Sequence, residues 1–295
     1  MRFDEPSRSI LPVVLEPKWI GREFLGPTLS FIKDVANTPR IDKAIFILMY
    51  LASNVTTEIT LESLEELLPH ALEEDEPDSR WTLIQAMQSI ATATTVCSDP
   101  QLRFLGYTLL SRFLDMCADD AKVYVLSELL ERCPWSAMRA ASVGLLKEQV
   151  QRAFDDPDLH ILKTPLLVMK ILPIIYKAET KSLFWHNYSF HMQALNFYLY
   201  VLIRDRQTNM TKVWDKPVLE VIQTNYFDPL KEVAEAIKHE AHEKEKQLNK
   251  GQGVPEGEEN PIVMAMRVEI LQNVIESIQH QWNLMEAERK ESDSS

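Results

Sequence analysis

The segment from His239 to His242 has the residue types of a zinc site, in the order His-Glu-Ala-His. In the H-E-x-x-H helix of zinc proteases the histidines lie four residues apart, so that both imidazoles face the metal. Here they lie three residues apart, inside the run KHEAHEKEKQ, whose charges alternate in sign. Such a run is typical of a solvated helix face. We therefore expect no metal site in this segment.

Motifs for other catalytic chemistry are missing from the sequence. It contains no G-x-G-x-x-G, no Walker-type loop and no G-x-S-x-G. Only 7 of its 295 residues are glycine, and phosphate-cradling loops and tight hairpins depend on glycines with positive φ. We therefore expect a protein that is not an enzyme and has no cofactor. A small-molecule enzyme with an unrecognised site is the disfavoured alternative.

The three cysteines, Cys97, Cys117 and Cys133, each lie in an apolar helical stretch, and no C-x-x-C occurs. An odd number without that spacing indicates a reducing compartment. We expect a cytoplasmic protein, with the nucleus as an open alternative. Because free cysteines usually behave as small buried hydrophobes, we expect all three thiols to be buried and unreactive. A redox role is the alternative interpretation.

One region combines aromatic and basic side chains. Its aromatic residues are Phe184, Trp185, Tyr188, Phe190, Phe197, Tyr198 and Tyr200. They either fill a helical core or form a partly exposed patch of the kind that dominates many protein–protein interfaces. The candidate partner-binding residues are the basic side chains around them and one tryptophan: Lys177, Lys181, Arg204, Arg206, Lys212 and Trp214. For Trp214 we favour a role as a structural anchor.

The elements that must position these residues are helices. Apolar residues recur at three- and four-residue spacing almost throughout the chain, as amphipathic helices require. Prolines are tolerated in the first helical turn, and seven of them open apolar-periodic runs: Pro27, Pro39, Pro100, Pro134, Pro165, Pro217 and Pro261. Pro173 and Pro229 fall inside such runs, so we expect kinks or short breaks there.

Two segments that lie 36 residues apart match one another. Leu102-Arg103 corresponds to Met138-Arg139, and Leu109-Leu110 corresponds to Leu145-Leu146. A helix pair of about this length is typical of HEAT-like repeats, which stack to bury their apolar faces. The sequence therefore predicts an all-α, HEAT-like helical repeat, an α-solenoid, with Leu109 and Leu146 buried.

The predicted organisation has five parts. We expect N-terminal helices in 1–78, HEAT-like repeats in 79–248, a flexible linker in 249–261, a C-terminal helix in 262–288 and a disordered tail in 289–295. The linker composition, NKGQGVPEGEENP, is polar and rich in glycine and proline.

The formal net charge of −13 argues against nucleic acid and anionic membranes as partners, because both bind clustered lysines and arginines. No apolar run approaches the roughly 18 residues of a spanning helix. Residues 1–9 lack the apolar stretch of a signal peptide. We expect a protein partner.

Two segments resemble the glomulin and fungal YAP-binding protein family. The first is DPQLRFLGYTLLSRFLDMCADDAKVYVLSELLERCPWSAMRAASVGLLKEQVQRAF, residues 99–154, and the second is YLYVLIRDRQTNMTKVWDKPVLEVIQTNYFDPL, residues 198–230. The order and spacing are similar over roughly residues 80 to 285, and correspond to the C-terminal half of the longer members. Within the first segment, CPWSAMRAASVGLLKE is most similar to the fungal branch.

The resemblance implies HEAT-like helical repeats and a non-enzymatic role. In the animal member this half binds the RING subunit of cullin–RING ubiquitin ligases and covers the surface that receives the ubiquitin-conjugating enzyme. Fungal members bind a bZIP stress transcription factor and promote its oxidation. We therefore expect a regulator, an inhibitor, of cullin–RING ligases. The alternative is a cytosolic adaptor or chaperone for a bZIP factor in the oxidative stress response.

Overall fold

The structure is a computed structural model that describes residues 16–33, 38–54, 56–66, 68, 82–158, 160–177, 181–248 and 260–293. Within these ranges no residue belongs to a β-strand, and an isolated β-bridge pairs Ile59 with Cys117. The all-α prediction is confirmed. No described helix is both long enough and apolar enough to span a bilayer.

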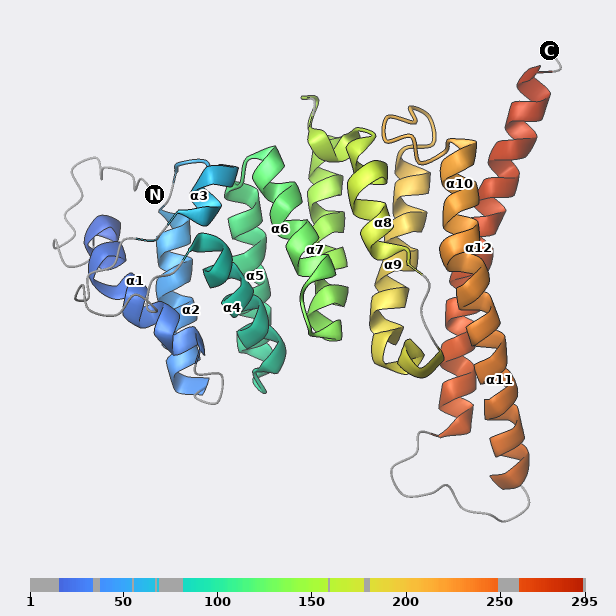
Figure 1. Ribbon diagram of the computed structural model, residues 1–295, viewed down its shortest axis with the longest axis horizontal. Coiled ribbons are helices and arrows are strands. Elements are labelled where there is room, and N and C mark those ends of the chain that lie inside the picture. The colour runs from blue at the N-terminus through green and yellow to red at the C-terminus, as the bar shows by residue number, and fades with distance from the viewer. Residues whose placement is uncertain are drawn as a thin grey trace. The chain divides into compact units, whose positions relative to one another are not determined.

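The chain forms two compact units, Met1–Leu162 (unit 1) and Lys163–Ser295 (unit 2). The helices of unit 1 are α1 (Pro17–Lys33), α2 (Thr38–Ser53), α3 (Leu61–Glu65), α4 (Leu83–Val96), α5 (Pro100–Met116), α6 (Asp119–Glu131) and α7 (Ser136–Asp155) (Figure 1). Helix α1 packs on α2, α4 on α5 and α6 on α7. Helix α5 also contacts α2 and α7, so consecutive helix pairs within this unit bury one another's apolar faces.

The two matched segments of the sequence form α5 and α7. Leu109 and Leu146 are fully buried, as predicted. Arg103 donates hydrogen bonds to two carbonyls just after α4, at 2.9 and 3.0 Å, and Arg139 donates to a carbonyl in the last turn of α6 at 3.1 Å. The last carbonyls of a helix have no partner within it. The matched arginines therefore tie the start of each helix to the end of the one before it.

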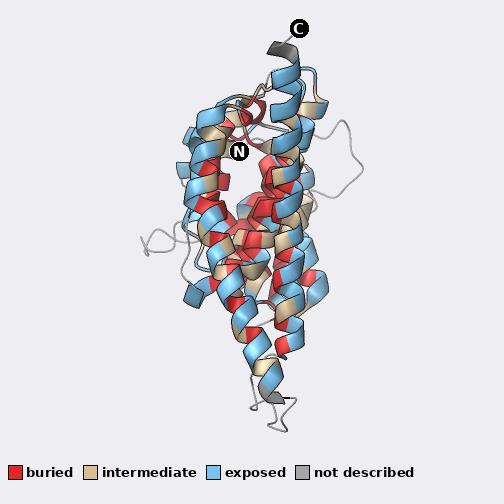
Figure 2. Ribbon diagram, turned by 90° about the vertical axis from the view of Figure 1, so that its right-hand side faces the viewer, coloured by how far each residue is buried: buried red, intermediate tan, exposed pale blue. Residues whose placement is uncertain are grey.

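Unit 2 contains two π-helical segments besides its α-helices. Its elements include η4 (Leu167–Ile171, π), α8 (Leu172–Ile175), α9 (Phe184–Arg204), α10 (Lys216–Ile222), η6 (Gln223–Phe227, π), α11 (Asp228–Leu248) and α12 (Pro261–Asp293). Helix α12 packs on α9 and α11. Figure 2 shows α11 and α12 from their outer side: their buried residues lie on the sides that face the rest of unit 2, and their exposed residues lie on the outer sides.

The two π-helical segments have an identifiable cause. Pro173 is the second residue of α8 and follows η4, and Pro229 is the second residue of α11 and follows η6. A proline inside a helix has no N–H to donate and its ring clashes with the carbonyl four residues earlier. Wider π-turns are a common accommodation of such defects. The helix therefore continues through both prolines by way of a π-helical turn, at the positions where we expected kinks or short breaks.

Some predicted boundaries differ from those of the structure. Pro27 lies inside α1, so the prediction that it opens a helix is wrong; Pro17 occupies the first position of that helix instead. Helix α12 continues to Asp293, so residues 289–293 are helical where we expected a disordered tail. Most of the predicted linker, residues 249–259, lies outside the described residues.

Candidate functional site

An apolar groove of about 600 Å³ opens in unit 2 between the η4–α8 segment and α10. Two of its apolar side chains are largely exposed to solvent, Met169 at 72% and Val221 at 56%. The residues that line the groove are Val168, Met169, Leu172, Pro173, Tyr176, Lys177, Pro217, Val218, Val221, Ile222 and Asn225. With one lysine and one amide among them, the groove is suited to bury apolar side chains.

One wall of the groove is fixed to the aromatic core of unit 2 through Tyr176. Its hydroxyl donates a hydrogen bond to the carbonyl of Ala194 on α9 at 2.9 Å. Its ring makes edge-on contacts with Tyr198 and Tyr226, at centroid distances of 5.4 and 5.1 Å. Burial raises the pKa of Tyr176 well above its usual value, so the phenol stays protonated and keeps this hydrogen bond. The wall is therefore preorganised.

The other wall, α10, follows a loop that is organised by the buried side chain of Asp205. Its Oδ1 accepts hydrogen bonds from Thr208 Oγ1 at 2.7 Å and from the Met210 N–H at 2.8 Å. Its Oδ2 accepts from the Thr211 N–H at 2.8 Å and from Thr211 Oγ1 at 2.6 Å. A fully buried carboxylate requires partners of this kind. The four donors hold the loop in one conformation.

Asn209 and Trp214 fix the part of the loop that leads directly into α10. Asn209 donates to Asp215, the N-cap residue of α10, at 2.7 Å and accepts from the Trp214 N–H at 3.1 Å. Its φ of 45° is in the left-handed region, which asparagine tolerates better than most residues. The Trp214 ring is 1% exposed and its Nε1 donates to the carbonyl of Leu202 at 3.0 Å. Trp214 is therefore buried like the structural anchor that we favour, and its ring presents little surface to a partner.

The structure brings one of the five basic candidates to the groove. Lys177 lines it. Lys181 pairs with Glu240 at 3.0 Å, and that hydrogen bond lowers the pKa of the carboxyl. Arg206 pairs with Glu288 on α12.

The two remaining basic candidates lie at the beginning and in the middle of the loop that precedes α10. Arg204 is exposed at the end of α9. Lys212 is exposed in the loop, with a φ of 65°. They belong to the segment that positions α10 and do not line the groove.

The aromatic cluster is mainly core. Phe184, Phe190, Phe197 and Tyr198 are each at most 2% exposed, which agrees with the helical-core interpretation for these four residues. Trp185, Tyr188 and Tyr200 are half-buried. The core also contains a buried histidine, His191, whose Nδ1 lies 2.9 Å from the Tyr226 hydroxyl.

Burial makes two of the three cysteine thiols poorly reactive. Cys97 and Cys117 are buried as predicted, whereas Cys133 is half-buried at the turn after α6, so its predicted burial is wrong. Burial raises the pKa of Cys117 to about 12 and also raises that of Cys133. Since the thiolate is the reactive form, both thiols are poor nucleophiles near neutral pH.

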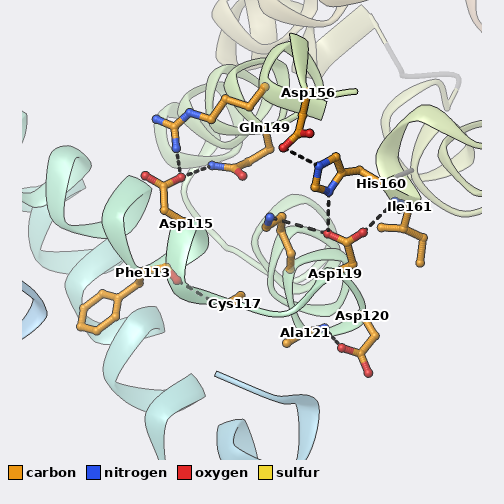
Figure 3. Close-up of polar contacts among 12 residues, drawn as sticks. Phe113, Asp115, Cys117, Asp119, Asp120, Ala121, Gln149, Asp156, His160 and Ile161 are labelled. Carbon is orange, nitrogen blue, oxygen red and sulfur yellow. Dashed lines mark hydrogen bonds and ion pairs between the residues drawn. The ribbon is translucent and has the colours of Figure 1, made fainter. Parts of the chain in front are cut away.

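A second polar cluster lies in unit 1, where side chains of α5, α6 and α7 meet the segment after α7 (Figure 3). His160 lies between two carboxylates, with Nε2 3.0 Å from Asp156 and Nδ1 3.8 Å from Asp119. Asp119 also accepts a hydrogen bond from the Ile161 N–H at 2.8 Å. The carboxylates of Asp119 and Asp156 are thus paired within unit 1, and these contacts hold the segment after α7 against the start of α6.

No group of three or more His, Cys, Asp or Glu side chains among the described residues could hold a metal ion. His239 and His242, the histidines of the zinc-like segment, are both exposed on α11. Their surroundings agree with a solvated helix face.

Sequence reasoning missed the groove residues Met169, Pro173 and Val221. A signal was present in the run Leu166–Ile175, LLVMKILPII, which is apolar except for Lys170. A short surface helix needs one apolar face. The core uses Leu167, Ile171 and Ile175, and Val168, Met169 and Pro173 line the groove.

Most of the chain is similar to a known sequence family. Residues 39–274 match a family described as an uncharacterised protein family, YAP/Alf4/glomulin. The chain belongs to this family. The predicted family is confirmed, and the match begins in α2, well before the residues on which the resemblance was based. A search of curated proteins finds no match.

The YAP/Alf4/glomulin match includes every residue that lines the groove. It also includes the loop that Asp205 organises and both π-helical segments. The groove therefore lies within the part of the chain that matches the family, and family membership supports a protein-binding role.

Proposed function

We propose that this YAP/Alf4/glomulin-family chain is a non-enzymatic protein-binding scaffold, built from HEAT-like helix pairs, whose partner docks in the apolar groove of unit 2. The observation that carries the proposal is the exposure of Met169 and Val221 in one groove with preorganised walls. Burying such a side chain fully contributes about 1.5–3 kcal/mol. A few central anchors of this kind supply most of the affinity of many interfaces.

The proposed partner is the RING subunit of a cullin–RING ubiquitin ligase. The RING face that receives the conjugating enzyme is small and carries exposed apolar anchors, which a groove of about 600 Å³ is suited to accept. A chain bound there would exclude the conjugating enzyme by occupancy alone. The result would be inhibition of the ligase without any catalytic step. We place the protein in the cytoplasm, with the nucleus as the alternative.

The basic candidates have a secondary role in this proposal. Lys177 would contact the partner at the groove itself, whereas Arg204 and Lys212 would contact it from the loop before α10. Arg206 and Lys181 are engaged in ion pairs within unit 2 and would have to exchange partners. Charged contacts at a rim change association rates more than affinity, so we expect smaller effects from these residues than from the apolar anchors.

Calorimetric titration of the purified RING subunit into the full chain tests the proposal. We expect binding at tens of micromolar or tighter, roughly −6 kcal/mol or better. In a reconstituted ligase reaction, the chain should slow ubiquitin chain formation while the charging of the conjugating enzyme with ubiquitin is unchanged. A chain that slows the charging step itself would act on the enzyme and not on the RING surface.

Absence of RING binding at tens of micromolar would favour the alternative, an adaptor for a bZIP stress transcription factor. The two proposals can be separated by pull-down from fungal lysate with and without peroxide. A bZIP factor retained in a peroxide-dependent manner supports the adaptor. A cullin-associated RING subunit retained equally in both conditions supports the ligase regulator.

A further inference from the structure

The charges around the groove identify the chemistry of its occupant, an inference that rests on the proposed protein-binding function. We propose that the groove takes a short partner segment in which carboxylates flank two or three apolar anchor side chains. The argument comes from the side chains that line the groove, from the helices that form its walls and from the length of those walls.

The groove is basic on a protein that is strongly acidic. Among the residues that the structure describes, Lys177 is the only charged side chain that lines it. The wall segment Leu167–Ile175 contains Lys170, which is exposed, and no aspartate or glutamate. The chain as a whole carries a formal charge of −13. A lysine-bearing surface on such a chain favours carboxylates over lysines and arginines in whatever it binds.

The second wall adds another lysine at its start. Lys216 precedes the lining residue Pro217, and its side chain is 79% exposed. Glu220, one turn later, lies 3.9 Å from Lys216. An exposed pair at that distance is worth about 0–1 kcal/mol, so a carboxylate of the partner can take the place of Glu220 at small cost.

The length of the walls limits the occupant to a segment. The η4–α8 wall has nine residues, from Leu167 to Ile175, which corresponds to about 13 Å at the helical rise. That length accommodates about two turns of a partner helix, or four residues of extended chain. Two or three apolar anchors therefore fill the groove, and the charges beside those anchors lie near Lys170, Lys177 and Lys216.

Anisotropy titrations with fluorescent peptides test this inference on the full chain. Three peptides of about 12 residues, roughly three helical turns, carry leucine at every third or fourth position. Their remaining positions are all glutamate, all glutamine or all lysine. We expect the glutamate peptide to bind about tenfold more tightly than the glutamine peptide, and the lysine peptide to bind least. Equal affinity for the three peptides, or tightest binding of the lysine peptide, would overturn the inference.

Two pairs of variants locate the site. Lys177→Glu should remove the preference for glutamate, whereas Lys290→Glu, the same charge change at an exposed residue of α12, should leave it intact. Met169→Asp should abolish binding of every peptide, whereas Met266→Asp, at a methionine of α12 that is 56% exposed, should not. Equal effects within either pair would overturn the assignment to the groove.

The outcome for the peptides is independent of the outcome for the RING subunit. If the RING subunit binds through Met169 but no peptide shows a charge preference, this inference fails and the proposed function stands. If the glutamate peptide binds at Met169 but the RING subunit does not, the inference stands and the choice of the RING subunit fails.

Discussion

Units 1 and 2 differ in how their apolar side chains are arranged at the surface. Unit 1 consists of regular helix pairs that cover one another, and two of its pockets, of about 220 and 150 Å³, have charged and amide side chains in their walls. Unit 2 contains two π-helical segments beside prolines and an apolar groove of about 600 Å³. Exposed apolar side chains occur in both units, for example Phe46 and Phe104 in unit 1. In unit 2, Met169 and Val221 line one apolar groove that is large enough to accept side chains of a partner.

The comparison separates residues that stabilise the fold from residues available for binding. A buried leucine of unit 1 is in contact on all sides, so its removal leaves a cavity. An exposed methionine of the groove makes few contacts within the protein, so its removal costs little stability. Substitution of a buried leucine should therefore change stability, whereas substitution of a groove residue should change binding.

The largest expected effect is on the core of unit 1. Leu146→Ala, or Leu109→Ala on the neighbouring α5, should lower the free energy of unfolding by about 2–5 kcal/mol, through lost burial and the cavity left behind. Urea denaturation followed by circular dichroism measures this. Changes below about 0.5 kcal/mol at both sites would contradict the packing of α5 against α7.

The loop before α10 should be nearly as sensitive. Asp205→Ala leaves the N–H groups of Met210 and Thr211 without their acceptor, and should lower the free energy of unfolding by about 3 kcal/mol. Asp205→Asn keeps an acceptor in place and should lose less. Because this loop precedes α10, Asp205→Ala should also weaken partner binding. Stability and affinity that are both unchanged would show that the loop does not position the groove wall.

The pH dependence of stability should distinguish Cys117, whose thiol is buried, from Cys133, whose thiol is half-buried. Burial raises the pKa of Cys117 from 9.0 to about 12, so the folded state holds the thiol neutral while the unfolded chain ionises it above pH 9. The stability contributed by the neutral thiol is therefore fully present below pH 9 and is lost as the pH rises toward 12. Between pH 9 and pH 10 the wild type should lose about 1 kcal/mol through this group. Denaturation of Cys117→Ala should show a flatter dependence on pH over that interval.

Cys133→Ala is the matched control for that experiment. The Cys133 thiol is half-buried, so its replacement should change the pH dependence less than replacement of Cys117. A larger change at Cys133 would mean that burial does not account for the alkaline loss of stability.

The helices and the core of this protein could be predicted from the sequence, because they follow from apolar periodicity alone. The burial of Leu109 and Leu146 and the helix irregularities beside Pro173 and Pro229 agree with the structure. These features depend on neighbours within a few residues or on one repeated pattern.

The groove could not be predicted in the same way. Met169 and Val221 look like core residues in the sequence, and their exposure depends on how η4–α8 and α10 are placed by Tyr176 and Asp205. Those contacts join residues far apart in the chain or within an irregular loop. For the same reason Arg206, a candidate partner contact in the sequence, is engaged in an ion pair inside unit 2.

The smallest expected effect on stability is at the groove itself. Met169→Ala removes a side chain that is 72% exposed, and should change the free energy of unfolding by no more than about 0.5 kcal/mol. The same urea titration used for Leu146→Ala gives the comparison directly. A loss of about 2 kcal/mol would mean that Met169 belongs to the core of unit 2 and is not available to a partner.

The most direct test of the central claim compares two exposed methionines of unit 2 in one binding measurement. Met169→Asp and Met266→Asp make the same chemical change, in the groove and on α12, at residues that are 72% and 56% exposed. In a calorimetric titration with the RING subunit, Met169→Asp should weaken binding at least tenfold, about 1.4 kcal/mol, while Met266→Asp binds like the wild type. Wild-type affinity in Met169→Asp, with binding lost in Met266→Asp, would contradict the groove as the partner site.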